Sequence, residues 1–163
     1  MAKVVQFKRG EDFLFKLSQI ELLTREEIIG GALYAGAAIL TDSVRAELKK
    51  IPTDESWGTV EHPTNGPKAI QKEGIAQSLG IAKMQDDGNG FYNVKIGFDG
   101  YNRVTTKRWP QGQPNQMVAR SVESGTTWMK KNPFVKRAAQ RSRNQAKVAM
   151  KQHITQSIKK IMK

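Results

Sequence analysis

The feature that most constrains this chain is its C-terminal segment, which contains no Asp or Glu after Glu123. Pro133 suits the first turn of a helix, because its missing N–H is not needed there, and Asn132 is the predicted N-cap. Apolar residues then recur at intervals of mostly three and four, which predicts a helix over about 133–162 with one apolar stripe. That stripe comprises Phe134, Val135, Ala138, Ala139, Ala146, Ala149, Met150, Ile154, Ile158 and Ile161.

The opposite face of this predicted helix is basic. Of the 27 Lys and Arg residues, eleven follow Glu123, so the first 123 residues hold sixteen of them against all 15 Asp and Glu and are nearly neutral. The net charge of +12 therefore belongs to one element. We expect a partner or assembly surface formed by Lys130, Lys131, Lys136, Arg137, Arg141, Arg143, Lys147 and Lys151.

Three interpretations of this basic face stay open at the level of sequence. A charged run is often only a solvated helix face. Clustered Lys and Arg also neutralise phosphates of nucleic acid, although few aromatic residues interleave with the charges here, so base stacking is not supported. Docking on an acidic protein surface needs only complementary charge and an apolar stripe.

A short motif connects this helix to the rest of the chain. Glu123-Ser-Gly-Thr-Thr closes an apolar run, and we expect the chain to reverse there. Gly125 can supply a backbone conformation that other residues disfavour, and Thr126 or Thr127 can hydrogen-bond within the turn. We predict a strand over Met117–Val122, although the spacing of Val118 and Val122 also suits a helical turn.

The N-terminal third of the chain predicts a strand followed by two helices. Val4 to Phe7 predicts a short strand, and Phe13 to Leu23 an amphipathic helix. Thr24 followed by Glu27 has the form of a capping box, so a second helix is expected from there towards Lys50, stopped by Pro52. This second helix has the widest apolar face, so we expect the apolar stripe of the C-terminal helix to pack on it. Its small residues from Gly30 to Ala38 let another helix approach closely. Packing within the chain is favoured over a subunit contact.

The middle of the chain predicts a hairpin between two loops. Residues 53–72 are polar and rich in Pro and Gly, with Trp57 expected to fold back onto the domain, and 103–116 form a second irregular loop. Alternating residues flank Asp86-Asp-Gly-Asn-Gly90, which predicts a β-hairpin. The expected fold is thus a single α+β domain over 1–163. Two N-terminal helices and a long C-terminal helix pack on a small antiparallel sheet built around the hairpin.

The sequence offers no motif of an enzyme or a metal site. The chain has no Cys, so thiol chemistry and disulfides are excluded. The acids from Asp86 lack calcium-loop spacing, because position twelve is Gly97, and His62 and His153 have no partner at ligand spacing. We therefore expect no catalytic residue, no metal and no cofactor. The N-terminus lacks a signal-peptide core, and Ile28–Leu40 is too short to span a bilayer, so a membrane partner is not expected.

The order of these motifs resembles one protein family. Val118-Ala-Arg-Ser-Val-Glu-Ser-Gly-Thr-Thr127, followed by Asn132-Pro-Phe-Val-Lys-Arg-Ala138, is similar to the C-terminal pattern of the neck or tail-completion proteins of long-tailed double-stranded DNA phages. Ser78 to Ile81 before the hairpin and Val94 to Asn102 after it resemble a branch of that family. The likeness extends over most of the chain from Glu11 onward. One departure is the longer insertion that begins at Pro52.

The resemblance implies a structural, non-enzymatic virion protein of the head-to-tail junction, assembled in the bacterial host cytoplasm. It would form a ring-like homo-oligomer between the connector or head-closure proteins and the tail terminator or tail tube proteins, close to packaged DNA. In this family pattern the structural motif falls on Glu123, Gly125, Thr126, Pro133 and Phe134. The alternative function is that of a small basic DNA-binding protein.

Overall fold

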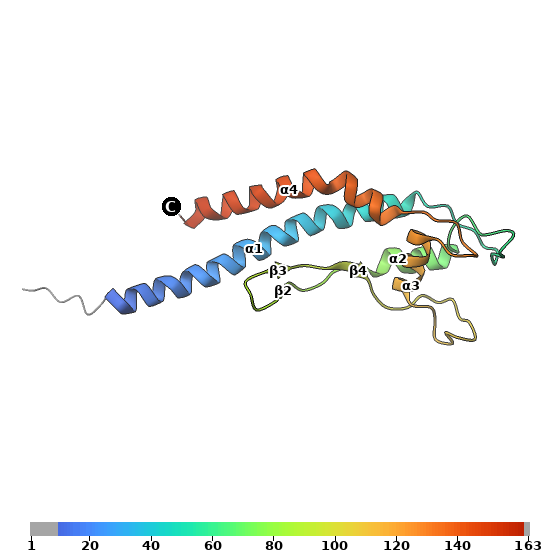
Figure 1. Ribbon diagram of the computed structural model, residues 1–163, viewed down its shortest axis with the longest axis horizontal. Helices are drawn as coiled ribbons and strands as arrows, with labels where there is room; N and C mark the ends of the chain where they lie inside the picture. The colour runs from blue at the N-terminus through green and yellow to red at the C-terminus, as the bar shows by residue number, and fades with distance from the viewer. Residues whose placement is uncertain (1–9, 162–163) are drawn as a thin grey trace, which may run out of the picture.

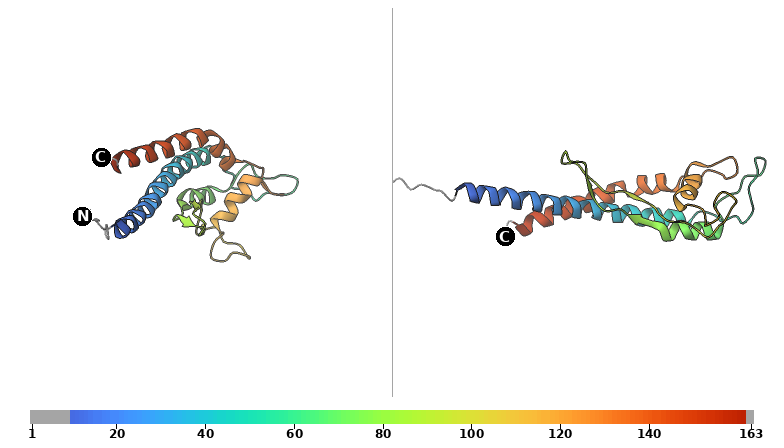
Figure 2. Two further views of the ribbon diagram at one scale, coloured as in Figure 1. Left: turned by 60° about the vertical axis from the view of Figure 1, so that its left-hand side comes forward. Right: turned by 90° about the horizontal axis from the view of Figure 1, so that it is seen from below.

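Two long antiparallel helices form the frame of the molecule in the computed structural model, which describes residues 10–161. Helix α1 spans Gly10–Lys49, and α4 spans Phe134–Ile161 and runs back along it (Figure 1). The remaining elements are α2 (Ala69–Ser78), α3 (Asn115–Ser124) and four short strands. The first turns of α1 extend beyond the end of α4, whereas α2, α3 and the loops gather at the other end (Figures 1 and 2).

The mixed α+β composition is confirmed, but the prediction of two N-terminal helices is wrong. One helix runs through Thr24 without a break. Between Glu11 and Ile29 the sequence has neither Gly nor Pro, so nothing ends the first helix, and a Thr-x-x-Glu pattern is compatible with a helix interior. The chain leaves α1 only before Pro52, as predicted. The strand predicted over Val4–Phe7 lies outside the described residues.

The hairpin is confirmed and consists of two short ladders. Strands β1 (Leu79–Ile81) and β4 (Ile96–Phe98) pair antiparallel with Leu79 opposite Phe98, and β2 (Gln85–Asp86) pairs with β3 (Tyr92–Asn93). Its turn requires positive φ at Gly88 and Gly90, at 81° and 82°, which glycine adopts without strain. The hairpin lies along α1, and a hydrogen bond from the Met84 amide to the Tyr34 hydroxyl fixes it there (2.7 Å).

The apolar core lies where α1 ends, at the level of α2, α3 and the first turns of α4. It contains Val44, Leu48, Ile51, Ile75, Leu79, Val118, Ala119, Val122, Phe134 and Ala138. Phe134 is fully buried, and its ring lies 6.0 Å from that of Phe98. Only the first turn of α4 therefore approaches the sheet. Most of α4 packs on α1 and not on the sheet, and α1 includes the helix from Thr24 on which the apolar stripe was expected to pack.

Glycines on α1 make the close helix pair possible. A Cβ on Gly31 would lie 2.1 Å from Cε1 of His153, and one on Gly36 would lie 2.8 Å from Cγ and Sδ of Met150. A side chain at either position would require the side chain of His153 or Met150 to move out of this contact. The interpretation of the small-residue segment as a packing site within the chain is confirmed.

The apolar stripe predicted for α4 is only partly correct. From Ala138 onward the buried or half-buried residues of α4 are Ala138, Ser142, Ala146, Ala149, Met150, His153 and Ser157. Ala139, Ile154 and Ile158 are exposed, the two isoleucines by 37% and 45%. The polar residues Ser142 and His153 lie in the seam in their place. The hydroxyl side chain of Ser142 is small, and His153 faces Gly31, which has no side chain, so both fit where α1 and α4 are close.

Candidate interaction surface

The predicted motif before α4 forms the joint between α3 and α4. The segment Met117–Val122, predicted as a strand, is helical and belongs to α3. Val118 and Val122, one turn apart, both face the core, so their spacing was the correct signal. Residues 115 and 116 of the predicted second loop are also helical. Likewise α2 begins at Ala69, inside the first predicted loop.

Glu123 caps α4 from the end of α3. Its two carboxylate oxygens accept hydrogen bonds from the amides of Val135 (2.8 Å) and Lys136 (3.1 Å). A carboxylate at this position satisfies two donors that have no partner within the helix and complements the positive end of the helix dipole. The side chain of Asn132, the predicted N-cap, instead accepts from Arg137 Nη2 (2.5 Å). Glu123 therefore takes the role that the sequence assigned to Asn132.

The turn between the two helices is confirmed. Gly125 has φ 75° at the C-terminus of α3, and its amide donates to the carbonyl of Ser121 (2.9 Å). Thr126 and Met129 then exchange backbone hydrogen bonds, and Thr126 Oγ1 accepts from the Trp128 amide (3.2 Å). A glycine suits this position because a side chain with such a φ would be strained.

The same turn anchors the first loop. The Thr64 amide donates to the carbonyl of Trp128, and the Lys130 amide donates to the carbonyl of Thr64, both at 2.9 Å. Within the loop, hydrogen bonds from Ser56 and from the Asn65 amide hold the pKa of Asp54 below its ordinary value of 3.8. Trp57 does not fold back onto the domain. It is exposed, with Lys68 Nζ 4.5 Å from its ring centre.

The seam between α1 and α4 contains one buried acid with three cations. The side chain of Glu47 is only 4% exposed and accepts from Lys50 Nζ (2.7 Å), Arg137 Nε (3.0 Å) and Arg141 Nη1. The hydrogen bonds from Lys50 and Arg137, together with the charge of Arg141, lower the pKa of Glu47 to about 2. Glu47 was missed in the sequence, because its partners on α4 lie 90 and 94 residues away and no local pattern marks it.

The eight predicted basic residues therefore divide into three groups. Arg137 and Arg141 reach inward to Glu47 and help to hold α4 on α1. Lys130 donates to the side chain of Asn65 (2.8 Å) at the loop. The exposed remainder, with no ion pair among residues 10–161, consists of Lys131, Lys136, Arg143, Lys147 and Lys151. We call these five residues the basic face.

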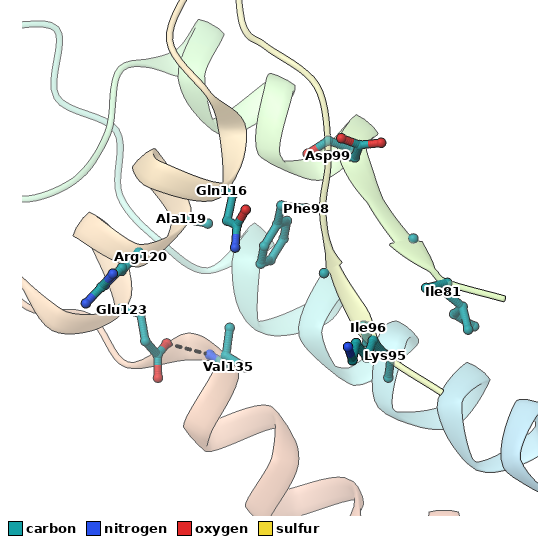
Figure 3. A pocket seen from close by; sticks show the side chains of 14 residues that line it. Ile81, Lys95, Ile96, Phe98, Asp99, Gln116, Ala119, Arg120, Glu123 and Val135 are labelled. Carbon is teal, nitrogen blue, oxygen red and sulfur yellow. Dashed lines mark hydrogen bonds between the residues drawn. The ribbon is translucent and has the colours of Figure 1, made fainter. Parts of the chain in front are cut away.

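An apolar groove of about 700 Å³ lies between the strand pair β1–β4 and α3, next to the start of α4 (Figure 3). Ile96, Phe98, Ala119 and Val135 line it, together with Arg120 and Glu123. Figure 3 shows the Glu123 carboxylate bonded to the Val135 amide, so this acid already has a structural partner. A second hollow of about 410 Å³ lies between Trp57 and Trp128.

Neither histidine is part of a metal-ligand cluster in the described chain. Residues 10–161 contain no group of three or more His, Asp or Glu side chains that could hold a metal ion. Within the same range no helix is sufficiently long and apolar to cross a membrane. Comparison of the chain with protein-family models, with curated proteins and with solved structures finds no match.

Proposed function

We propose that this protein is a structural component of a phage head-to-tail junction. In this proposal the basic face of α4 docks on an acidic surface of a neighbouring junction protein. The observation that carries it is the distribution of charge: α4 has no acid along its length, and its exposed cations lie on a helix held at its start by Glu123 and on its inner side by Glu47. A preorganised row of like charges favours a complementary partner, because little ordering is needed on binding.

The resemblance to neck and tail-completion proteins supports the same function. The residues that carry it meet at one place in the fold: Glu123 caps α4, Gly125 turns the chain, and Phe134 enters the core. The motif thus has a physical reason to recur, since it sets the direction in which α4 leaves α3. The proposed protein has no catalytic role and needs no cofactor.

The proposed location is the neck of the virion, after assembly in the host cytoplasm. There the chain would form a ring-like homo-oligomer between the connector or head-closure proteins on one side and the tail terminator or tail tube proteins on the other. Electrostatic docking also explains why the basic residues are spread along a helix and not gathered around a cavity.

The experiment is a triple charge reversal on the basic face: Lys136→Glu, Arg143→Glu and Lys147→Glu. Arg137 and Arg141 are left unchanged, because reversing them would disturb Glu47. In the encoding phage we expect heads and tails to form and to remain separate, with a melting temperature of the purified protein close to that of the unmodified one. Exposed charges contribute roughly 0–1 kcal/mol each to stability.

The matched control reverses three exposed cations elsewhere, Lys83, Arg103 and Lys107, which gives the same change in net charge. In phage that carry this control variant, heads should join tails normally. Normal yields of infectious particles from the α4 variant would refute the docking role. If the α4 variant still joins heads to tails but no longer binds DNA in a salt-sensitive gel-shift assay, the alternative function as a small basic DNA-binding protein is supported.

A further inference from the structure

The end of the hairpin is acidic and carries an exposed aromatic side chain. Phe91 is 73% exposed. Beside it, Asp86 accepts from the Gly88 amide (2.9 Å), and Asp87 accepts from the amides of Asn89 (2.9 Å) and Phe91 (3.1 Å). Neither carboxylate forms an ion pair with a described residue. We call Asp86, Asp87 and Phe91 the hairpin tip.

The tip projects from a fixed base. The Met84 amide donates to the Tyr34 hydroxyl (2.7 Å), and the Tyr92 hydroxyl donates to Glu26 (3.3 Å), so both strands next to the turn are attached to α1. A partner that binds the tip would therefore not have to order a free loop.

The far half of α4 carries a complementary surface. Lys147, Lys151, Ile154 and Ile158 follow one another at intervals of four, three and four, so they lie in one line along the helix. All four are exposed, because they lie on a different side of the helix from its half-buried residues, which here are Ala146, Ala149, Met150, His153 and Ser157. Two cations next to two isoleucines form a surface that fits an acidic turn with one aromatic side chain. We call these four residues the distal stripe.

The tip and the distal stripe of one molecule do not meet. The hairpin and α4 lie on different sides of α1 (Figures 1 and 2), and adjacent glycines of α1 contact different neighbours, Gly30 facing Met84 and Gly31 facing His153. The two complementary surfaces are therefore available to other molecules at the same time.

We propose that the hairpin tip of one copy docks on the distal stripe of α4 in a second copy. Phe91 would cover Ile154 and Ile158, while Asp86 and Asp87 would pair with Lys147 and Lys151. In the proposed contact one copy uses its tip and the other its stripe, so each copy keeps one surface for a further copy, and repeating the contact closes a ring or extends a filament. This inference rests on the homo-oligomer of the proposed function and assigns Lys147 and Lys151 to the contact between copies, which leaves Lys131, Lys136 and Arg143 of the basic face for the neighbouring junction protein. It concerns the purified chain alone and can be tested without a phage.

The test is a charge exchange followed by sedimentation velocity of the full-length chain. A tip variant carries Asp86→Lys and Asp87→Lys, and a stripe variant carries Lys147→Glu and Lys151→Glu. Each alone places like charges at the contact, so we expect self-association to weaken by about tenfold or more. Mixed in equal amounts they should associate again, since each contact then joins opposite charges. A chain with all four changes should assemble by itself.

The substitution Phe91→Ser tests the apolar part of the proposed contact, in which Phe91 covers Ile154 and Ile158. It should abolish assembly and leave the melting temperature unchanged, because the ring is exposed in the single chain. Lys83→Glu with Lys107→Glu is the control for charge and should assemble normally. An unmodified chain that stays monomeric, or reversed variants that fail to restore each other, would overturn the proposal. Normal yields of infectious phage from the Lys136, Arg143 and Lys147 triple variant, together with normal self-association of the unmodified chain, would instead count only against the proposed function.

Discussion

At the scale of single residues, Glu47 is the side chain on which the helix pair depends most directly. Its carboxylate is nearly inaccessible and is shared by Lys50, Arg137 and Arg141. Removing one member of such a cluster leaves the others with incomplete partners at the seam. From the sequence, Arg137 and Arg141 were predicted to belong to the exposed assembly surface. In the structure they pair with Glu47 and hold α4 on α1.

The first prediction concerns the pH dependence of folding. The pKa of Glu47 is about 2 in the folded chain against an ordinary 4.5, so its contribution is present above about pH 4.5 and is lost as pH falls towards 2. Glu47→Gln should therefore melt at a lower temperature than the unmodified protein at pH 7, and the gap should narrow across this window. Asp42→Asn, which removes the exposed pair with Arg45, is the control and should show a much smaller gap.

The second prediction concerns Gly125. A Cβ there would lie 3.0–3.1 Å from atoms of Lys131, and its φ of 75° is disfavoured for other residues. Gly125→Val should destabilise the fold by roughly 1–3 kcal/mol in urea denaturation. Gly97→Ala is the comparison, because a methyl group at Gly97 would meet no other part of the chain within 4 Å and its φ is not positive. Equal stability of Gly125→Val and the unmodified chain would show that the turn does not need glycine.

At the scale of elements, α4 depends on a cap supplied by another helix. Glu123→Ala would leave the amides of Val135 and Lys136 without their acceptor. We expect a loss of about 0.5–2 kcal/mol and faster hydrogen exchange at these two amides. Asn132→Ala, which removes the side chain first expected to cap, should leave exchange at both amides unchanged. Faster exchange at these amides in Asn132→Ala, with unchanged exchange in Glu123→Ala, would instead identify Asn132 as the cap.

A further prediction separates the two faces of α4. Ala138 is fully buried, so Ala138→Asp should cost several kcal/mol and loosen the helix pair. Ile154→Asp should leave the melting temperature of the single chain nearly unchanged, because Ile154 is exposed. This differs from the expectation based on the apolar stripe, in which Ile154 belonged to the core. Similar losses for both variants would show that Ile154 is covered after all.

Elements differed in how well the sequence predicted them, for physical reasons. The hairpin and α4 were predicted because their signals are local: turn glycines, alternation, and a proline entry with helical spacing. Helix α2 was missed because residues 53–72 are polar, rich in Pro and Gly and poor in aliphatic side chains, which predicted a loop up to Lys72. Gly74 within the helix allows close contact, since a Cβ there would lie 2.7 Å from Asn115 Oδ1. The overlooked signal was Pro67 before the helix and Gln71, whose side chain accepts from the Lys68 amide (2.9 Å).

At the scale of the whole molecule, the two loops are attached differently. The first is tied to the α3–α4 turn by hydrogen bonds between Thr64 and both Trp128 and Lys130, whereas the second is closed mainly by its own bonds between Thr106 and Trp109. We therefore expect slower hydrogen exchange at Thr64 and Lys130 than at residues 103–109. We also expect both loops to become more ordered on assembly, and hydrogen exchange of the assembled particles measures this. Equal exchange in the free and assembled states would contradict it.

The candidate site shows the limit of sequence reading at this scale. The basic residues and the motif were found because they are contiguous in the chain. Glu47, and the separation of the basic residues into inward and outward groups, depend on how α1 and α4 meet, and no short-range pattern encodes that. The acidic hairpin tip was interpreted as a turn only. That the tip complements the distal stripe of another copy can be inferred only from the structure, in which the hairpin and α4 lie on different sides of α1.

The pairing of the first helix with the last has a consequence for synthesis of the chain. Glu47 is made 90 residues before its partner Arg137, and the glycine-lined side of α1 has no cover until α4 leaves the ribosome. Such distant contacts form slowly, and uncovered helix surface is prone to association in the meantime. A nascent chain that stops before residue 134 therefore exposes the side of α1 on which α4 packs. We expect such a chain to self-associate, and synthesis of α4 to remove this tendency.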